Sequence, residues 1–213
     1  MSNYKSEKLS RIKKIDYFFG DKKTKADAYT LNQVHGDNVV ILDKPPETNM
    51  QISGDSIITN IENFSIGVKT ADCLPILLTN ESSSFVGAVH AGWRGTFYKI
   101  ICKTIDKIEV NFKVKPKDII AVIGPSIADC CFEVGGDLYK KFVKNFPDFN
   151  SCFSETESQK RIDLKKINTL LLEKMGVREI EVLSECTKCN LNFYSYRRDK
   201  SKSQNQISKI NRN

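Results

Sequence analysis

Two apolar segments separated by a short polar turn lie near the middle of the chain. Leu74–Thr79 and Phe85–His90 have the composition of buried strands, and Asn80–Ser83 between them favours a turn. Beyond Gly95 the apolar residues recur instead at helical spacing: Phe97, Ile100, Ile101, Ile105 and Ile108. Two strands followed directly by a helix predict a fold in which sheet and helix share one core.

Similar strand and helix patterns follow one another along the rest of the chain. We expect strands at Val39–Leu42, Ser56–Thr59, Phe64–Val68, Ile119–Ile123 and Glu179–Leu183, and further helices at Asp137–Phe146 and Asp163–Met175. Thr96 is the expected N-cap of the central helix, and Gly176 is the expected C-cap of the last one. This mixture predicts an α/β or layered α+β fold.

The length and the chain ends bound the domain. No internal repeat or Pro/Gly-rich linker divides the 213 residues, which suit one domain, and we place it at residues 15–199. Residues 1–14 are polar and lysine-rich. Residues 200–213 are polar too, with Ile207 and Ile210 as their only apolar residues. Both ends are therefore expected to be surface segments or frayed ends.

Charge and cysteine usage narrow the class of protein. The net charge of +7 comes from lysines spread along the chain without a zinc-finger or RNA-recognition pattern, so we expect no nucleic-acid partner. No apolar run approaches the roughly 20 residues of a membrane helix, so we expect no membrane partner. The N-terminus shows no secretory pattern, and seven cysteines suggest no disulfide framework. We therefore expect a cytoplasmic protein with reduced thiols.

The chain contains only two histidines, and each lies next to glycine-containing turn sequence. His35 precedes Gly36, and His90 ends an apolar strand just before a glycine-rich turn. Between them, Cys73 lies where one strand ends and another begins. Two imidazoles and a thiolate are good zinc ligands, and three protein ligands leave a position open, as in catalytic sites. The spacing matches no local zinc motif, so from the residues alone their convergence stays open.

Other chemistry-bearing residues give weaker signals. Cys186 and Cys189 form a lone C-x-x-C pair, which cannot complete a four-cysteine zinc site without a second pair. The adjacent pair Cys130 and Cys131 lies in a turn-rich loop and needs no special role. Arg94 could bind a phosphate or carboxylate, and Tyr194–Asp199 could stack a base and bind an anion.

Taken in order, several of these segments resemble one family, the laccase-domain proteins, also called YfiH-type or polyphenol-oxidase-like proteins and understood as purine nucleoside phosphorylases. The matching segments are Gln33–Gly36, Gly54–Ser56, Thr70–Pro75, Gly87–Gly95, Ile123–Ile127, Cys130–Val134 and Phe193–Asp199. His90–Gly95, with the sequence His-Ala-Gly-Trp-Arg-Gly, is the most distinctive of them. In place of the family's Thr-Gly-Arg segment and apolar final strand, a polar tail follows Asp199, so this edge is expected to differ.

The resemblance implies a fold, a metal and a set of site residues. It implies a single domain of mixed β-sheets covered by helices, distantly similar to a deamidating toxin. It implies a metal held by His35, Cys73 and His90, with zinc preferred over copper. The implied reactions are phosphorolysis of adenosine, inosine and methylthioadenosine, which needs phosphate as a partner, and deamination of adenosine. We assign catalysis to Asp72 (proton transfer), Cys73 and Arg94, and substrate binding to Gln33, Asp55, Arg94, Tyr196 and Arg197.

Three other functions compete with this one. In a cysteine hydrolase acting on peptidoglycan-type amides, Cys73 would be the nucleophile and His90 or His35 its base. Copper-dependent oxidation of phenols is the source of the older family name, but a multicopper centre needs more imidazoles than two histidines supply. A non-enzymatic metal-binding protein would hold a stoichiometric metal without turning over nucleosides.

Overall fold

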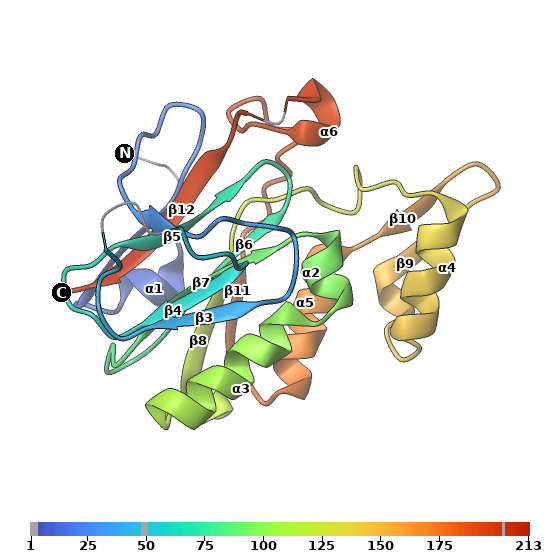
Figure 1. The fold of residues 1–213 in the computed structure, drawn as a ribbon. Helices are drawn as coiled ribbons and strands as arrows, with labels where there is room; N and C mark the ends of the chain where they lie inside the picture. Colours follow the sequence, from blue (N-terminus) through green and yellow to red (C-terminus); the bar gives the residue numbers. More distant parts are fainter. Residues whose placement is uncertain (1–3, 48–50, 202) are drawn as a thin grey trace.

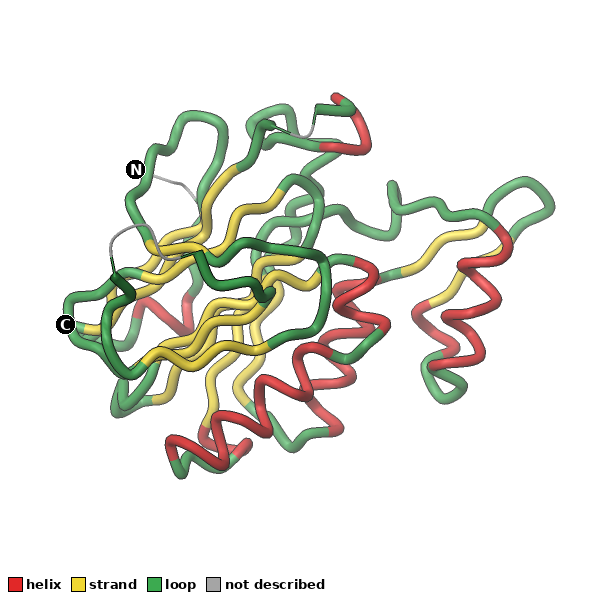
Figure 2. Tube along the Cα trace, in the orientation of Figure 1, coloured by secondary structure: helices red, strands yellow, loops and turns green. Residues whose placement is uncertain are grey.

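The computed structural model describes residues 4–47, 51–201 and 203–213. Two β-sheets lie face to face at its centre, and helices cover the outer face of the larger sheet (Figure 1). Loops connect most elements at the two ends of the sheets (Figure 2). This single domain of mixed sheets and helices confirms the predicted fold class.

The larger sheet has six strands. Their order is β11 (Glu179–Val182), β8 (Ile119–Ile123), β6 (Leu74–Asn80), β7 (Val86–Ala91), β4 (Ser56–Thr59) and β3 (Val39–Leu42). The outer pairs β11–β8 and β3–β4 are parallel, and the inner pairs are antiparallel. Every residue of β6 and β7 is buried, which explains why both segments are nearly continuous apolar runs rather than alternating ones.

The smaller sheet packs against one face of the larger one. Its strand order is β1 (Ile15–Phe19), β12 (Gln206–Arg212), β5 (Ile66–Thr70) and β2 (Tyr29–Thr30). Strands β5 and β12 contact β6 and β7, and together they enclose one of the two hydrophobic cores. The short helix α1 (Glu7–Ser10) closes this core beside β8 and contributes the buried Leu9.

Helices enclose the second core on the opposite face of the larger sheet. They are α2 (Trp93–Phe97), α3 (Ile100–Phe112) and α5 (Leu164–Lys174). Beyond them, α4 (Gly136–Asn145) packs with the hairpin of β9 (Phe153–Glu155) and β10 (Lys160–Ile162) (Figure 1). Within the described residues, the remaining elements are two 3₁₀ turns at Pro116–Asp118 and Asn150–Cys152 and a short helix, α6 (Tyr196–Asp199).

Side-chain alternation along β7 sets the direction of the histidine at its end. Val89 and Ala91 belong to the core under the helices, whereas Val86 and Ala88 belong to the core between the sheets. Successive side chains of a strand point to opposite faces. His90 therefore points to the same side as Ala88, beyond the end of the inter-sheet core.

The central elements lie close to their predicted positions, with two local differences. The strand predicted at Phe64–Val68 is shifted to β5, two residues later. The helix predicted after Gly95 is divided into α2 and α3 by Lys99, which has a left-handed backbone with φ 56° and is the N-cap of α3. Thr96, the expected N-cap, lies inside α2 instead. Gly176 follows α5 with φ +90°, a backbone conformation that favours glycine at this position.

Both chain ends differ from the expected surface or frayed segments. Strand β12 lies between β1 and β5, so the polar tail supplies an inner strand of the smaller sheet. Its burial is possible because pairing on both sides satisfies the backbone N–H and C=O groups, and because small buried polar side chains such as Ser208 alternate with partly buried ones. At the other end, Leu9 and Ile12 of the expected polar segment are buried, whereas residues 1–3 lie outside the described part.

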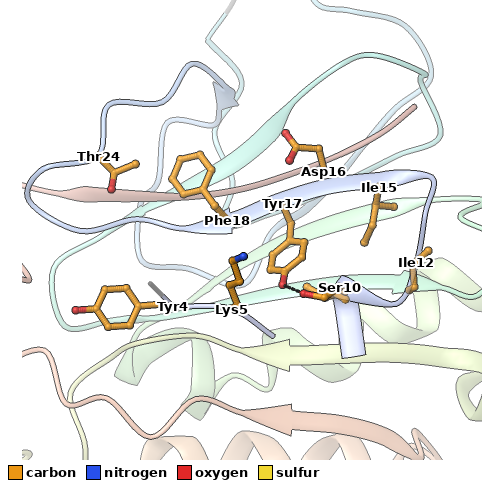
Figure 3. Close-up of a pocket in the computed structure, with 10 residues that line it drawn as sticks. Tyr4, Lys5, Ser10, Ile12, Ile15, Asp16, Tyr17, Phe18 and Thr24 are labelled. Atoms are coloured by element: carbon orange, nitrogen blue, oxygen red, sulfur yellow. Dashed lines mark hydrogen bonds between the residues drawn. The ribbon is translucent and has the colours of Figure 1, made fainter. Parts of the chain in front are cut away.

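A surface cavity lies where the N-terminal segment meets β1. It is lined by Tyr4, Lys5, Leu9, Ser10, Ile12, Ile15, Asp16, Tyr17, Phe18 and Thr24 (Figure 3). The hydroxyl groups of Ser10 and Tyr17 are hydrogen-bonded at 2.6 Å across it. These lining residues include none of the predicted site residues. Among the described residues, no helix is both long enough and apolar enough to cross a bilayer.

Candidate metal centre

Three side chains from distant parts of the sequence meet at one end of the larger sheet. His35 lies in the loop before β3, Cys73 in the turn between β5 and β6, and His90 near the end of β7. A ligand atom of each, an imidazole nitrogen or the thiol sulfur, lies within 4.8 Å of those of the other two. The two imidazole rings meet edge to face, with centroids 4.7 Å apart. The structure therefore brings together the three ligands that the sequence predicted.

The backbone around these side chains is shaped for close approach. His35 and Asp72, which precedes Cys73, have φ values of 58° and 87°, in the left-handed region that costs energy for residues other than glycine. A Cβ atom at Gly92 would lie 2.9 Å from the Cys73 sulfur and 3.5 Å from the His35 ring. Only glycine leaves room for the sulfur at this point.

A buried carboxylate supports two of the three ligands. Asp55 is fully buried, and its Oδ1 lies 2.8 Å from Nδ1 of His90. The same carboxylate accepts hydrogen bonds from the backbone N–H groups of His35 and Gly36 at 2.9 and 2.7 Å. With Nδ1 bound to a carboxylate, His90 presents its other nitrogen, Nε2, for binding a metal ion, an arrangement common in metal sites. Substrate binding by Asp55 remains a prediction; in the structure its buried carboxylate is occupied by these hydrogen bonds and orients the His90 ring.

The electrostatics of the cluster favour the thiolate form of Cys73, which is the form that binds metal ions. Burial disfavours the Cys73 thiolate, but the imidazoles of His90 and His35 outweigh it and lower the pKa of Cys73 to about 6. Burial likewise disfavours the His90 imidazolium, but Cys73 and Asp55 outweigh it and raise the pKa of His90 to about 9. Both shifts favour the charged forms, a thiolate at Cys73 and an imidazolium at His90. A metal cation would take the place of the imidazolium proton.

The donor set of this cluster fits a metal ion. One thiolate and two imidazoles supply three protein ligands of types that zinc prefers, as in catalytic zinc sites whose fourth position stays open, and one buried carboxylate already orients a ligand ring. The three-ligand cluster of His35, Cys73 and His90 can hold a single cation with one position open.

Comparison with known proteins assigns this chain to a family. Residues 15–213 match the family model described as multi-copper polyphenol oxidoreductase laccase. The chain belongs to this laccase family. It is 37% identical over 198 residues to a protein of Aquifex aeolicus named purine nucleoside phosphorylase, covering 92% of this chain and 84% of that protein. A protein of Clostridium acetobutylicum with the same activity in its name is 34% identical, covering 81% of this chain and 72% of that one.

Solved structures of similar proteins share the fold. YlmD from Geobacillus stearothermophilus is 30% identical with a TM-score of 0.80, covering 86% of this chain and 72% of that structure. A Bacillus licheniformis protein described as hypothetical protein YfiH is 30% identical with a TM-score of 0.76, covering 86% and 73%. These matches confirm the resemblance stated from the sequence motifs.

In this laccase-family chain, the Asp72 carboxylate connects the turn before Cys73 to two C-terminal loops through hydrogen bonds. Its Oδ1 accepts a hydrogen bond from the Thr187 hydroxyl at 2.7 Å. Its Oδ2 accepts from the Ser195 hydroxyl at 3.0 Å and from the Arg197 backbone N–H at 2.6 Å. Because both oxygens of this buried carboxylate are occupied, Asp72 is better suited to hold the chain beside Cys73 than to the proton transfer predicted for it.

The other predicted site residues lie at the surface around these loops. The exposed Arg94 guanidinium lies 4.2 Å from the centroid of the Trp93 ring, and Tyr196 is also exposed. The Arg197 side chain donates to a backbone carbonyl of residue 133 at 2.7 Å. Gln33 both accepts from and donates to the backbone of Lys69, each at 2.8 Å, and so ties its loop to β5. Substrate binding by Arg94, Tyr196, Arg197 and Gln33 remains a prediction.

A second cluster of possible metal ligands, made of four cysteines, was not predicted from the sequence. Cys130, Cys131, Cys186 and Cys189 bring their sulfur atoms within 4.8 Å of one another. In the sequence, the C-x-x-C pair Cys186 and Cys189 has no visible partner. The second pair, Cys130 and Cys131, ends 55 positions before Cys186. The signal that could have found the cluster was the count of four cysteines in two close pairs.

Proposed function

We propose that this chain is a zinc-dependent purine nucleoside phosphorylase that acts on adenosine and inosine, with methylthioadenosine as a further substrate. The three-ligand cluster with its buried carboxylate support is the observation that carries the proposal. The names of the relatives in Aquifex aeolicus and Clostridium acetobutylicum supply the substrate class. We also propose adenosine deamination at the same site.

Zinc suits this site better than copper. A thiolate and two imidazoles are borderline-soft ligands that zinc prefers, whereas a multicopper centre needs more imidazoles than the two histidines of the whole chain. When bound, zinc supplies Lewis acidity and one open coordination position.

The residues of the chain have distinct tasks in this proposal. Asp55 holds the His90 ring in one tautomer and one orientation, and Cys73 supplies the anionic ligand. Arg94, exposed two residues after Gly92, is the proposed phosphate ligand, because a planar guanidinium binds phosphate through paired hydrogen bonds. Tyr196 offers an exposed ring for stacking on the purine base. Asp72 acts as a positioning residue for the backbone that carries Cys73.

One observation favours a second function, a cysteine hydrolase. The lowered pKa of Cys73 and the raised pKa of His90 describe a thiolate–imidazolium pair, which is also the resting state of a cysteine nucleophile with its base. Metal content separates the two functions, because a sulfur bound to zinc is not a free nucleophile.

The experiment combines elemental analysis with a product assay. Purified protein is analysed for zinc, copper and iron, then incubated with adenosine in the presence and absence of phosphate. The proposal predicts bound zinc, phosphate-dependent release of adenine, and inosine from deamination. His90→Ala should abolish turnover and lower the zinc content, whereas Cys102→Ser, a half-buried thiol on α3, should leave both unchanged. Full turnover by His90→Ala would contradict the metal mechanism.

A further inference from the structure

We infer that Cys130, Cys131, Cys186 and Cys189 form a second metal site, which holds one structural zinc ion. Cys130 and Cys131 lie in the loop after β8, and Cys186 and Cys189 lie in the loop after β11. These two strands are parallel neighbours in the larger sheet, so the loops that leave them emerge at the same edge. All four sulfur atoms lie within 4.8 Å of one another.

The sulfur separations fit a single tetrahedral ion. Sulfur atoms 2.3 Å from a zinc ion at tetrahedral angles are about 3.8 Å apart. The Cys189 sulfur lies 3.9 Å from that of Cys130 and 3.3 Å from that of Cys131. An iron–sulfur cluster places several irons and sulfides between its cysteines and needs a wider spacing. The geometry therefore favours one mononuclear ion with four thiolates.

Backbone hydrogen bonds prepare one sulfur as an anionic ligand. The N–H of Ala128 donates to the Cys186 sulfur at 3.4 Å, and the backbone N–H groups of Lys188 and Cys189 also bond to it. Turns in which successive N–H groups point at one atom are suited to anions. The C-x-x-C turn is thus already folded around the sulfur before an ion arrives.

Two basic side chains brace the loop that carries this turn. The Arg198 guanidinium donates to the carbonyl oxygens of residues 187 and 188 at 3.1 and 3.0 Å. The ammonium group of Lys165, a residue only 7% exposed, donates to the carbonyl oxygens of residues 183 and 185 at 2.6 and 2.9 Å. Four thiolates around a divalent ion carry a net charge of −2. The Lys165 ammonium group offsets part of that charge, whereas the Arg198 guanidinium is already paired with Asp199 at 2.7 Å.

The four-cysteine site is connected to the catalytic cluster through one residue between its ligands. Thr187, which lies inside the C-x-x-C turn, is fully buried and donates its hydroxyl to Asp72. Its backbone N–H donates to the carbonyl of Ser126 at 3.1 Å. An ion bound by the four cysteines would fix the position of Thr187 and, through Asp72, the backbone that carries Cys73. We therefore assign the second ion a structural role that supports the first site.

The test counts metal ions per chain in protein purified under reducing conditions. We expect two zinc equivalents in the wild-type chain. Cys189→Ser, at an exposed position, should lose one equivalent and keep the one held by His35, Cys73 and His90. His90→Ala should lose the other, and Cys102→Ser should keep both. The counts from the two single variants separate the second site from the proposed catalytic site.

Cobalt substitution identifies the ligands of each site. A Co²⁺ ion with four thiolates gives much stronger sulfur-to-metal charge-transfer absorption than one with a single thiolate. We expect the strong bands in wild-type and His90→Ala protein and their loss in Cys189→Ser. Cys189→His should regain the ion with weaker bands, since imidazole replaces one thiolate; this variant decides the case if Cys189→Ser fails to fold.

Two results would overturn the inference. One is an unchanged zinc count in Cys189→Ser together with the wild-type cobalt spectrum. The other is a disulfide among these four cysteines, found by mass spectrometry of a non-reduced digest of metal-replete protein, since a disulfide sulfur is not available as a thiolate ligand. Either result would reduce the cluster to ordinary or redox-paired thiols.

Discussion

Nδ1 of His90 lies 2.8 Å from Oδ1 of Asp55, and both side chains are buried. The carboxylate fixes which ring nitrogen faces the neighbouring Cys73 and His35. It also accepts hydrogen bonds from two backbone N–H groups of the loop that carries His35, so this one side chain orients both His90 and His35. The geometry of the three-ligand cluster therefore depends on a residue that does not belong to it.

Replacing this carboxylate should weaken metal binding. Asp55→Asn keeps the shape but removes the charge that orients and polarises the His90 ring, and a change of this kind costs about 10- to 100-fold in metal affinity. Zinc affinity is measured by competition with a chromophoric chelator. The matched control is Asp37→Asn, a nearby carboxylate that pairs with Lys103. Equal affinity in wild type and Asp55→Asn would contradict the role assigned to Asp55.

Adding one methyl group at Gly92 should disturb the same site. The backbone of Gly92 has φ −70° and ψ 179°, which alanine adopts freely, so Gly92→Ala tests space alone. Its Cβ would lie 2.9 Å from the Cys73 sulfur, which must shift. We expect zinc affinity to fall at least 10-fold, by analogy with other changes that displace or reorient a ligand. Gly135→Ala, where a Cβ would meet nothing within 4 Å, should keep wild-type affinity.

Removing the Thr187 hydroxyl should destabilise the fold. Thr187→Val keeps the side-chain shape but leaves one oxygen of the buried Asp72 without its hydrogen bond. An unsatisfied buried acceptor costs about 1–3 kcal/mol of unfolding free energy. Urea denaturation measures this loss. In the control, Thr169→Val, the lost bond runs only to the carbonyl of Lys165 in the same helix, and the cost should be smaller. A Thr187→Val chain as stable as wild type would argue against the anchoring role of Asp72.

Stability at acid pH should depend on Glu181 of β11. Its carboxylate accepts hydrogen bonds from Ser6 Oγ, Glu7 N and Lys8 N at 2.7, 3.0 and 2.9 Å. Burial acts to raise the pKa of Glu181, but these bonds outweigh it and lower the pKa below 4.5. A depressed pKa adds stability that is present above the unfolded-state value and lost as the pH falls through the folded-state value.

The corresponding variant is Glu181→Gln. It should be less stable than wild type at neutral pH, and the difference should shrink as the pH falls below about 4.5, the ordinary glutamate range. Thermal unfolding from pH 3 to pH 7 measures the difference. Glu157→Gln, an exposed residue between β9 and β10, serves as the control and should follow the wild-type curve. A constant difference across the pH range would contradict the assignment.

The central fold could be predicted because burial leaves a plain pattern in the sequence. Strands β6 and β7 are buried on both faces and read as continuous apolar runs, and α3 shows helical spacing. Strand β12 could not be found in this way. Its buried positions include Gln206 and Ser208, so no apolar alternation marks it, and only its pairing with β1 and β5 makes it a strand.

The two groups of possible metal ligands differ in how far the sequence could predict them. The scarcity of histidine and the family motifs pointed to His35, Cys73 and His90, although their meeting depends on the tertiary fold. Asp55 was assigned to substrate because nothing local in the sequence shows that its carboxylate turns inward to His90. The pairs Cys130–Cys131 and Cys186–Cys189 were given no shared role, because they lie far apart in the sequence and meet only through the loops of two neighbouring strands.

Anomalous diffraction at the zinc absorption edge, from crystals of the reduced, purified protein, shows whether His35, Cys73 and His90 hold a zinc ion. We expect a peak bound by an imidazole nitrogen of His35, the sulfur of Cys73 and Nε2 of His90, with bonds of about 2.0–2.3 Å. Crystals of Asp55→Asn should show a weaker peak at the same place. Protein that phosphorolyses adenosine at full rate with no metal density between these three side chains would contradict a catalytic metal at this site.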